Sequence, residues 1–122
     1  MRVKDAVGRF GEQRAVEHLE AAGLEILDRN WRCRTGELDI VARDGPQLVF
    51  VEVKTRSSLA FGAPAEAVDR AKSVRIRELA LRWIMAQRDA GTQMFWATLR
   101  FDVVSVVRGR SGVEISHLPG AF

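Results

Sequence analysis

Two acids and a lysine lie on neighbouring predicted strands. Strands in the core of a sheet usually carry apolar side chains instead. Asp39 belongs to the run GELDIVAR at 36–43, and Glu52 and Lys54 belong to the run LVFVEVKT at 48–55. Side chains alternate between the two faces of a strand, so Glu52 and Lys54 point to the same face. Two carboxylates and an ammonium group at one end of a sheet form a coherent site for hydrolysing phosphodiester bonds.

The connection between the two runs decides whether their acids meet. A four-residue DGPQ loop pairs Arg43 with Leu48, which sets Asp39 directly across from Glu52. A two-residue Asp-Gly turn makes the two acids diagonal neighbours, whereas a three-residue loop puts them on opposite faces. Because Pro46 cannot donate a ladder hydrogen bond, the four-residue loop is favoured.

Carboxylates at a cross-strand spacing repel each other, and away from water they need a cation to remain ionised. Oxygen ligands with a few waters suit Mg²⁺ or Mn²⁺. Beside such an ion and a phosphate, Lys54 would orient or deprotonate the attacking water, or stabilise developing negative charge. The pattern is equally consistent with a solvent-facing polar side of the sheet, on which Asp39, Glu52 and Lys54 form a cross-strand salt bridge.

A third acid, Glu12, lies on the apolar face of a predicted helix at 5–22, together with Ala15 and Leu19. Burying a carboxylate without a partner is costly, so Glu12 is expected to have one. The metal site, a nearby arginine and a helix-terminal amide are the candidates, and the helical periodicity does not choose among them.

The elements that position these residues follow from periodicity and turn signals. Predicted strands cover 24–32, 36–43, 48–55, 98–108 and 113–117, and a predicted second helix runs from Pro64 to about Asp89 after a loop at 57–64. The side of this helix that faces the core carries apolar residues, namely Val68, Ile76, Leu79 and Trp83. The order α-β-β-β-α-β-β predicts an α/β fold in which helices flank a mixed central sheet, with residues 1–122 in a single domain.

Composition narrows the class of protein. The chain has 122 residues, 47% of them hydrophobic and 29% charged, which is typical of a globular domain and excludes a disordered or collagen-like chain. No apolar run approaches the roughly 20 residues of a membrane span, and no secretory signal is recognisable at the start. Cys33 is the single cysteine, so we expect a reducing, cytoplasmic setting.

The longest motifs of the chain carry a resemblance to known nucleases. The series Asp39…Glu52-Val53-Lys54 resembles the Asp…Glu-x-Lys core of the restriction-endonuclease-like, or PD-(D/E)xK, superfamily, with the spacing of archaeal Holliday-junction resolvases. More closely, GRFGEQRAVEHLEAAGLEIL, NWRCRTGELDIVARDGPQLVFVEVKTR and AVDRAKSVRIRELALRW look like the YraN family, a bacterial family regarded as endonucleases. One departure from the superfamily pattern is Leu38, which stands where a proline often precedes the first acid.

The resemblance implies a restriction-endonuclease-like fold and a role for each residue of the motif. By that likeness, Asp39 and Glu52 are the metal-binding acids, and the main-chain carbonyl of Val53 is a further ligand for Mg²⁺ or Mn²⁺. Lys54 matches the catalytic lysine, and Glu12 matches the acid of the leading helix.

Basic residues flank the acidic strands and predict a nucleic-acid partner. The formal net charge is +3, and 16 of the 19 basic residues are arginines, whose planar guanidinium groups bind phosphates. Arg32, Arg34 and Arg56 lie on either side of the acids, with Trp31 among them as a stacking candidate. Lys72 falls on the apolar side of the second helix, where it either points toward the site or extends past the apolar stripe to solvent.

These features together predict a divalent-metal-dependent nuclease that hydrolyses DNA, with branched or damaged DNA as the substrate class that the resolvase likeness implies. A resolvase would act as a homodimer, because it must cut two strands. The alternative from another class is a non-catalytic nucleic-acid-binding or partner-recruiting module that retains the fold. A clustered set of acids favours the enzyme, since acids repel phosphate and a simple binder has no need of them.

Overall fold

A computed structural model describes residues 3–57 and 69–122. Two helices and five strands follow each other in the predicted order α-β-β-β-α-β-β, which is confirmed. Their bounds are α1 Val3–Ala21, β1 Glu25–Cys33, β2 Gly36–Asp44, β3 Gln47–Arg56, α2 Arg70–Asp89, β4 Thr98–Gly109 and β5 Gly112–Leu118. The predicted loop at 57–64, the helix start at Pro64 and the core position Val68 lie outside the described residues, apart from Ser57.

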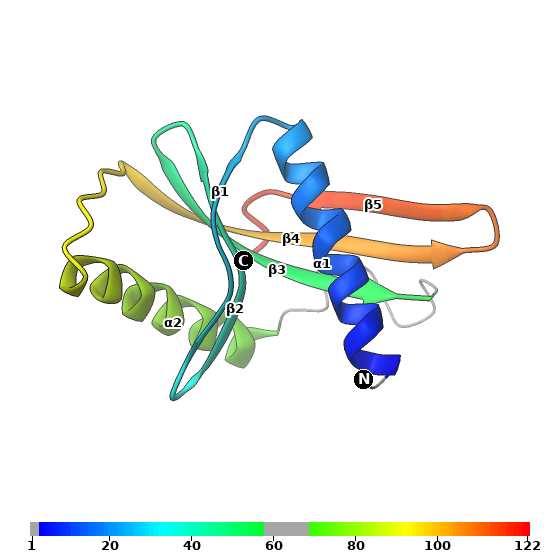
Figure 1. Cartoon of the computed structure of the whole chain (residues 1–122), viewed down its shortest axis with the longest axis horizontal. Coiled ribbons are helices and arrows are strands. Elements are labelled where there is room, and N and C mark those ends of the chain that lie inside the picture. Colours follow the sequence, from blue (N-terminus) through cyan, green and yellow to red (C-terminus); the bar gives the residue numbers. More distant parts are fainter. Residues whose placement is uncertain (1–2, 58–68) are drawn as a thin grey trace.

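The five strands form one sheet in the order β1-β2-β3-β4-β5. Three neighbouring pairs are antiparallel, whereas β3 and β4 run parallel, so the predicted mixed sheet is confirmed. The parallel pair requires a crossover, and α2 belongs to the connection that makes it. In Figure 1, α1 crosses one face of β3 and β4, and the β1–β2 hairpin curves away from the rest of the sheet.

The register of the β2–β3 hairpin is the predicted one. Arg43 pairs with Leu48, and the ladder continues by one further pair, Asp44 with Gln47. The strands are therefore joined by a two-residue turn of Gly45 and Pro46 rather than by a four-residue loop. The extra pair does not change which residues face each other, so the expected opposition of the two acids survives the shorter turn.

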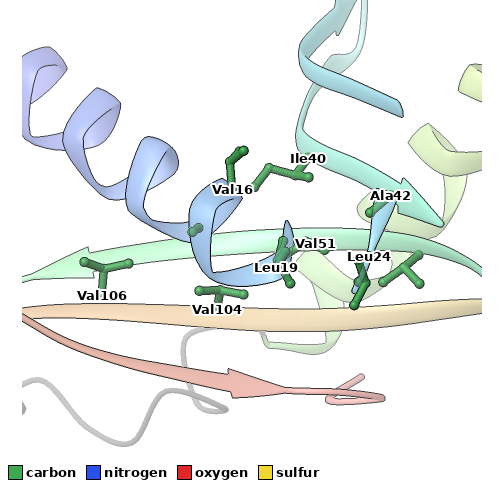
Figure 2. Packing of buried hydrophobic residues seen from close by; sticks show 10 residues of the cluster. Val16, Leu19, Leu24, Ile40, Ala42, Val51, Val104 and Val106 are labelled. Atoms are coloured by element: carbon green, nitrogen blue, oxygen red, sulfur yellow. The ribbon is translucent and has the colours of Figure 1, made fainter. Parts of the chain in front are cut away.

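Two apolar layers hold the helices on opposite faces of the sheet. On one face, α1 packs through Ala15, Val16 and Leu19 against alternate residues of the strands, including Val51 and Val104 (Figure 2). The side chains of β3 that point the other way lie under α2, which contributes Ile76, Leu79, Ala80, Trp83 and Ile84 to the second layer. Strand alternation thus supplies both layers, and the predicted core side of α2 is confirmed from Ile76 onward.

A glycine fixes how closely α1 approaches β3. A Cβ atom at Gly11 would overlap the hydroxyl oxygen of Thr55, so only glycine allows the helix to pack at this distance. Gly8 has nothing within 4 Å of such an atom, and it is exposed, so the close packing depends on Gly11 and not on Gly8. The close approach places the next residue, Glu12, against the strand that carries the predicted catalytic lysine.

The outer side of α2 exposes apolar side chains at helical spacing. Val74, Leu81 and Met85 are 50%, 56% and 61% exposed, and arginines flank them along the helix. In the described part of the chain, neither helix is long and apolar enough to cross a membrane.

Candidate metal and phosphodiester site

The candidate site lies where β2 and β3 separate. Their ladder extends from the turn as far as the pair Ile40–Val51. Beyond that pair, β2 stays paired with β1, whereas β3 continues beside β4 to Arg56. The two strands therefore form a fork that opens at the pair Ile40–Val51. The residues just before Ile40 on β2 and just after Val51 on β3 surround its opening. These are the positions of Asp39 and of Glu52, Val53 and Lys54.

The fork holds the two predicted metal-binding acids together. Asp39 accepts a hydrogen bond of 2.8 Å from the main-chain N–H of Val53, so its carboxylate takes the place of a ladder partner for β3. Its side chain also shares a hydrogen bond with Glu52. Burial, and then the neighbouring negative charge of Glu52, raise the pKa of Asp39 to about 7. The two carboxylates repel each other strongly enough that a proton or another cation must separate them.

The donor set at the fork fits a divalent cation. The N–H and C=O groups of one strand residue point to the same side, so the Val53 carbonyl faces the fork together with its N–H. Within residues 3–57 and 69–122, no three His, Cys, Asp or Glu side chains are arranged to hold a metal ion. Asp39, Glu52 and the Val53 carbonyl are instead the sparse oxygen set through which Mg²⁺ is usually bound, with waters completing the coordination.

Lys72 reaches Glu52 from the other helix. Its ammonium nitrogen lies 2.6 Å from Glu52 Oε1, and the side chains of the lysine and the acid are 36% and 15% exposed, respectively. Asp69, the N-cap of α2, accepts a 2.8 Å hydrogen bond from the main-chain N–H of Lys72 and so fixes the first turn of the helix. Of the two orientations that the sequence left open for Lys72, the structure shows the one that points to the site.

Glu12 reaches the same region from α1. It is 8% exposed, and its Oε1 atom accepts hydrogen bonds from Arg29 Nε at 3.0 Å and Asn30 Nδ2 at 2.8 Å. Asn30 adopts a positive φ of 49° within β1, a conformation that asparagine tolerates better than most residues. An arginine and a side-chain amide are therefore the partners of Glu12 at the border of the site.

A hollow of about 970 Å³ connects these groups, large enough for a segment of phosphodiester backbone. Its lining combines residues of α1, of the β1–β2 hairpin and of the end of β3, among them Glu12, Asn30, Arg32, Asp39, Val53 and Lys54. Glu52 is not part of this lining; it contacts Asp39 on the side where Lys72 approaches. Asp39 and Lys54 therefore line the same hollow, and Asp39 also contacts Glu52.

The predicted phosphate-binding arginines lie in different settings. Arg32 lines the hollow and forms a 3.1 Å ion pair with Glu37, with the two side chains 78% and 52% exposed. Arg34 is exposed near the tip of the same hairpin. Arg56 is only 8% exposed, so it is the least accessible of the three. Trp31 packs against the apolar layer under α2, which leaves less of its ring available for stacking on a base than the sequence suggested.

A buried acid of β4, Asp102, accepts several hydrogen bonds and did not stand out in the sequence. Asp102 is completely buried in β4, and its carboxylate accepts hydrogen bonds from Arg100, from the main-chain N–H of Gly120 and from His117 Nε2 at 2.7 Å. Burial acts to raise the pKa of Asp102, but the hydrogen bonds from His117 and Arg100 outweigh it and hold that pKa below its ordinary value. The sequence signal for this cluster is an acidic residue, Asp102, within the largely apolar run FDVVSVV at 101–107.

The fold and the fork define a mixed α/β protein with a pair of interacting carboxylates and a lysine at one strand end. The model for "Uncharacterised protein family UPF0102" matches residues 11–106, which run from the middle of α1 into β4 and include all of α2 and the whole fork. The chain therefore belongs to the UPF0102 family.

Several bacterial proteins are similar to this chain over nearly its full length. A UPF0102 protein of Beutenbergia cavernae is 58% identical over 121 residues, which cover 98% of each chain. UPF0102 proteins of Frankia alni and Frankia casuarinae are 57% and 54% identical over 123 residues, covering all of this chain and 98% and 100% of the relatives.

Proposed function

We propose that this protein is a divalent-metal-dependent nuclease of the restriction-endonuclease-like class that hydrolyses phosphodiester bonds in DNA. The observation that carries the proposal is the contact between Asp39 and Glu52 at the fork, with Lys54 beside them on the border of an open hollow. A buried acid whose pKa is raised by burial and by a neighbouring acid is typical of functional sites. The likeness of the Asp…Glu-x-Lys motif to the YraN and resolvase-like nucleases supports the same conclusion.

The residues of the fork would divide the reaction among them. Asp39, Glu52 and the carbonyl of Val53 would hold Mg²⁺ or Mn²⁺, which when bound polarises a phosphoryl oxygen and promotes ionisation of water. Lys54 would hold the attacking water or stabilise the charge that develops on the phosphate. Glu12, which accepts hydrogen bonds from Arg29 and Asn30, would orient groups on the α1 side of the hollow.

The alternative is a non-catalytic nucleic-acid-binding module, and one observation favours it. The ion pair between Lys72 and Glu52 already neutralises one of the two acids without a metal. A cleavage assay separates the two functions: the enzyme should cut at least one of duplex, single-stranded, flap and four-way DNA with Mg²⁺ or Mn²⁺. Absence of cleavage across this panel, with DNA binding retained, would favour the module.

Metal binding should depend on both acids and on pH. We expect calorimetric titration to show Mn²⁺ binding to the wild type and none to Glu52→Ala, because a single remaining carboxylate is a weak site. Since the pKa of Asp39 is raised to about 7, its proton competes with the metal below that pH, and affinity should increase from pH 6 to pH 8. Equal affinity in the wild type and Glu52→Ala would refute the assignment.

DNA binding should be mainly electrostatic. We expect the affinity for duplex DNA to fall steeply with salt, with each phosphate contact adding close to one unit to the log–log slope. Arg34→Ala should reduce this slope by about one unit, because Arg34 is exposed at the tip of the hairpin whose Arg32 lines the hollow. Arg88, exposed in the last turn of α2, is the matched control, and its replacement by alanine should leave the slope unchanged. A slope near zero in the wild type would contradict the prediction.

A further inference from the structure

The ammonium group of Lys72 lies where a cation beside Glu52 would be expected. The distance of 2.6 Å from Nζ to Oε1 is that of a direct, charge-assisted hydrogen bond. The Glu52 side chain is 15% exposed, so bulk water screens this contact only partly. A metal ion that binds Glu52 at the same oxygen therefore has to replace Lys72.

The position of Lys72 on its helix shows that this contact is specific. Lys72 lies on the same side of α2 as Ile76, Leu79 and Trp83, which are buried against the sheet. A lysine at the border of such a stripe usually extends its charged end to solvent. Here the charged end turns to an acid of β3 instead, while the hydrogen bond to Asp69 holds the backbone of the first helical turn. Only the flexible side chain would need to move for the ion pair to open.

We propose that Lys72 is the resident counter-cation of Glu52, which neutralises this acid in the metal-free protein and competes with the divalent metal for it. The inference rests on the proposed metal site and adds a residue that sets its affinity. Glu52 alternates between two cations: the ammonium group when metal is scarce, and the metal when it is abundant. Lys72 thereby sets the metal concentration at which the site fills, and it is a positioning residue rather than a catalytic one.

The test compares the Mn²⁺ affinity of the wild type and three variants by calorimetry at pH 8. Lys72→Met removes the ammonium group and keeps the length of the side chain, so we expect Mn²⁺ to bind about tenfold more tightly, which corresponds to about 1.4 kcal/mol. Lys72→Arg keeps a cation and should stay near the wild type. Arg88→Met, exposed in the last turn of α2 and far along the helix from Lys72, removes one charge away from Glu52 and should change the affinity by less than about threefold.

A thermal measurement guards against a variant that is merely destabilised. The increase in Tm at a fixed Mn²⁺ concentration should be larger for Lys72→Met than for the wild type, whatever the Tm of each metal-free protein. Equal or weaker Mn²⁺ binding by folded Lys72→Met would overturn the inference and leave the metal site standing. An equal gain in Arg88→Met would also overturn it, because net charge would then explain the effect. If no protein in the series binds Mn²⁺, the metal site and the inference both fail.

Discussion

Lys54→Ala should lower the rate of metal-dependent DNA cleavage by about 10²–10³-fold while DNA affinity changes little. Lys54 lines the hollow beside Asp39 and Val53, so its ammonium group would lie at the phosphate under attack. A group whose interaction strengthens mainly in the transition state affects the rate far more than binding. Loss of one such electrostatic group typically costs about 3–4 kcal/mol of transition-state stabilisation.

The experiment needs single-turnover cleavage rates and binding isotherms on the same DNA. Arg110→Ala is the matched control, because Arg110 is exposed in the β4–β5 turn and its loss removes one positive charge away from the fork. Lys54→Arg tests geometry: it retains the charge, but a guanidinium group differs in shape and hydration. Cleavage at the wild-type rate by Lys54→Ala would exclude the lysine from the chemistry, and a loss of affinity as large as the loss of rate would assign it to binding.

The opposition of the two acids could be predicted because it depends on local rules. Strand alternation fixed the faces of Glu52 and Lys54, and the inability of Pro46 to donate a ladder hydrogen bond pointed to the correct register. The predicted loop length was wrong, but the predicted register was correct. The additional pair between Asp44 and Gln47 shortens the turn by two residues and moves no side chain to the other face. The sequence could not show that β2 and β3 separate immediately beyond the pair Ile40–Val51, next to Asp39.

The partners of the acids could not be predicted, since they come from elements far away in the chain. Glu12 is satisfied by Arg29 and Asn30, which depends on how closely α1 packs on the sheet at Gly11. Helical periodicity placed Lys72 on the side of α2 that faces the sheet, but it did not say which strand residue would lie beneath it. Such contacts are decided by tertiary packing, which periodicity does not encode.

A buried acid in β4 carries the second large expected effect, this time on stability. Asp102→Asn should lower the free energy of unfolding by about 3–5 kcal/mol, as expected when one partner of a buried charged network is removed. The carboxylate joins Arg100, His117 and the main-chain N–H of Gly120, so it links β4 to β5 and to the C-terminal turn. Arg100 in turn donates to Asp44 at 2.9 Å and thereby ties the β2–β3 turn to the same network.

The acid dependence of this effect distinguishes the network from packing. Because the pKa of Asp102 is lower in the folded protein than in the unfolded chain, its stabilising contribution is fully present above about pH 4 and is lost as the pH falls through the folded-state pKa. Denaturant unfolding at pH 7 and at pH 3 should therefore show a smaller difference between wild type and Asp102→Asn at the lower pH. Glu114→Gln removes an exposed carboxylate from β5 and should change stability by less than about 0.5 kcal/mol. A pH-independent loss in Asp102→Asn would mean that the shape of the side chain, rather than its charge, holds β4 and β5 together.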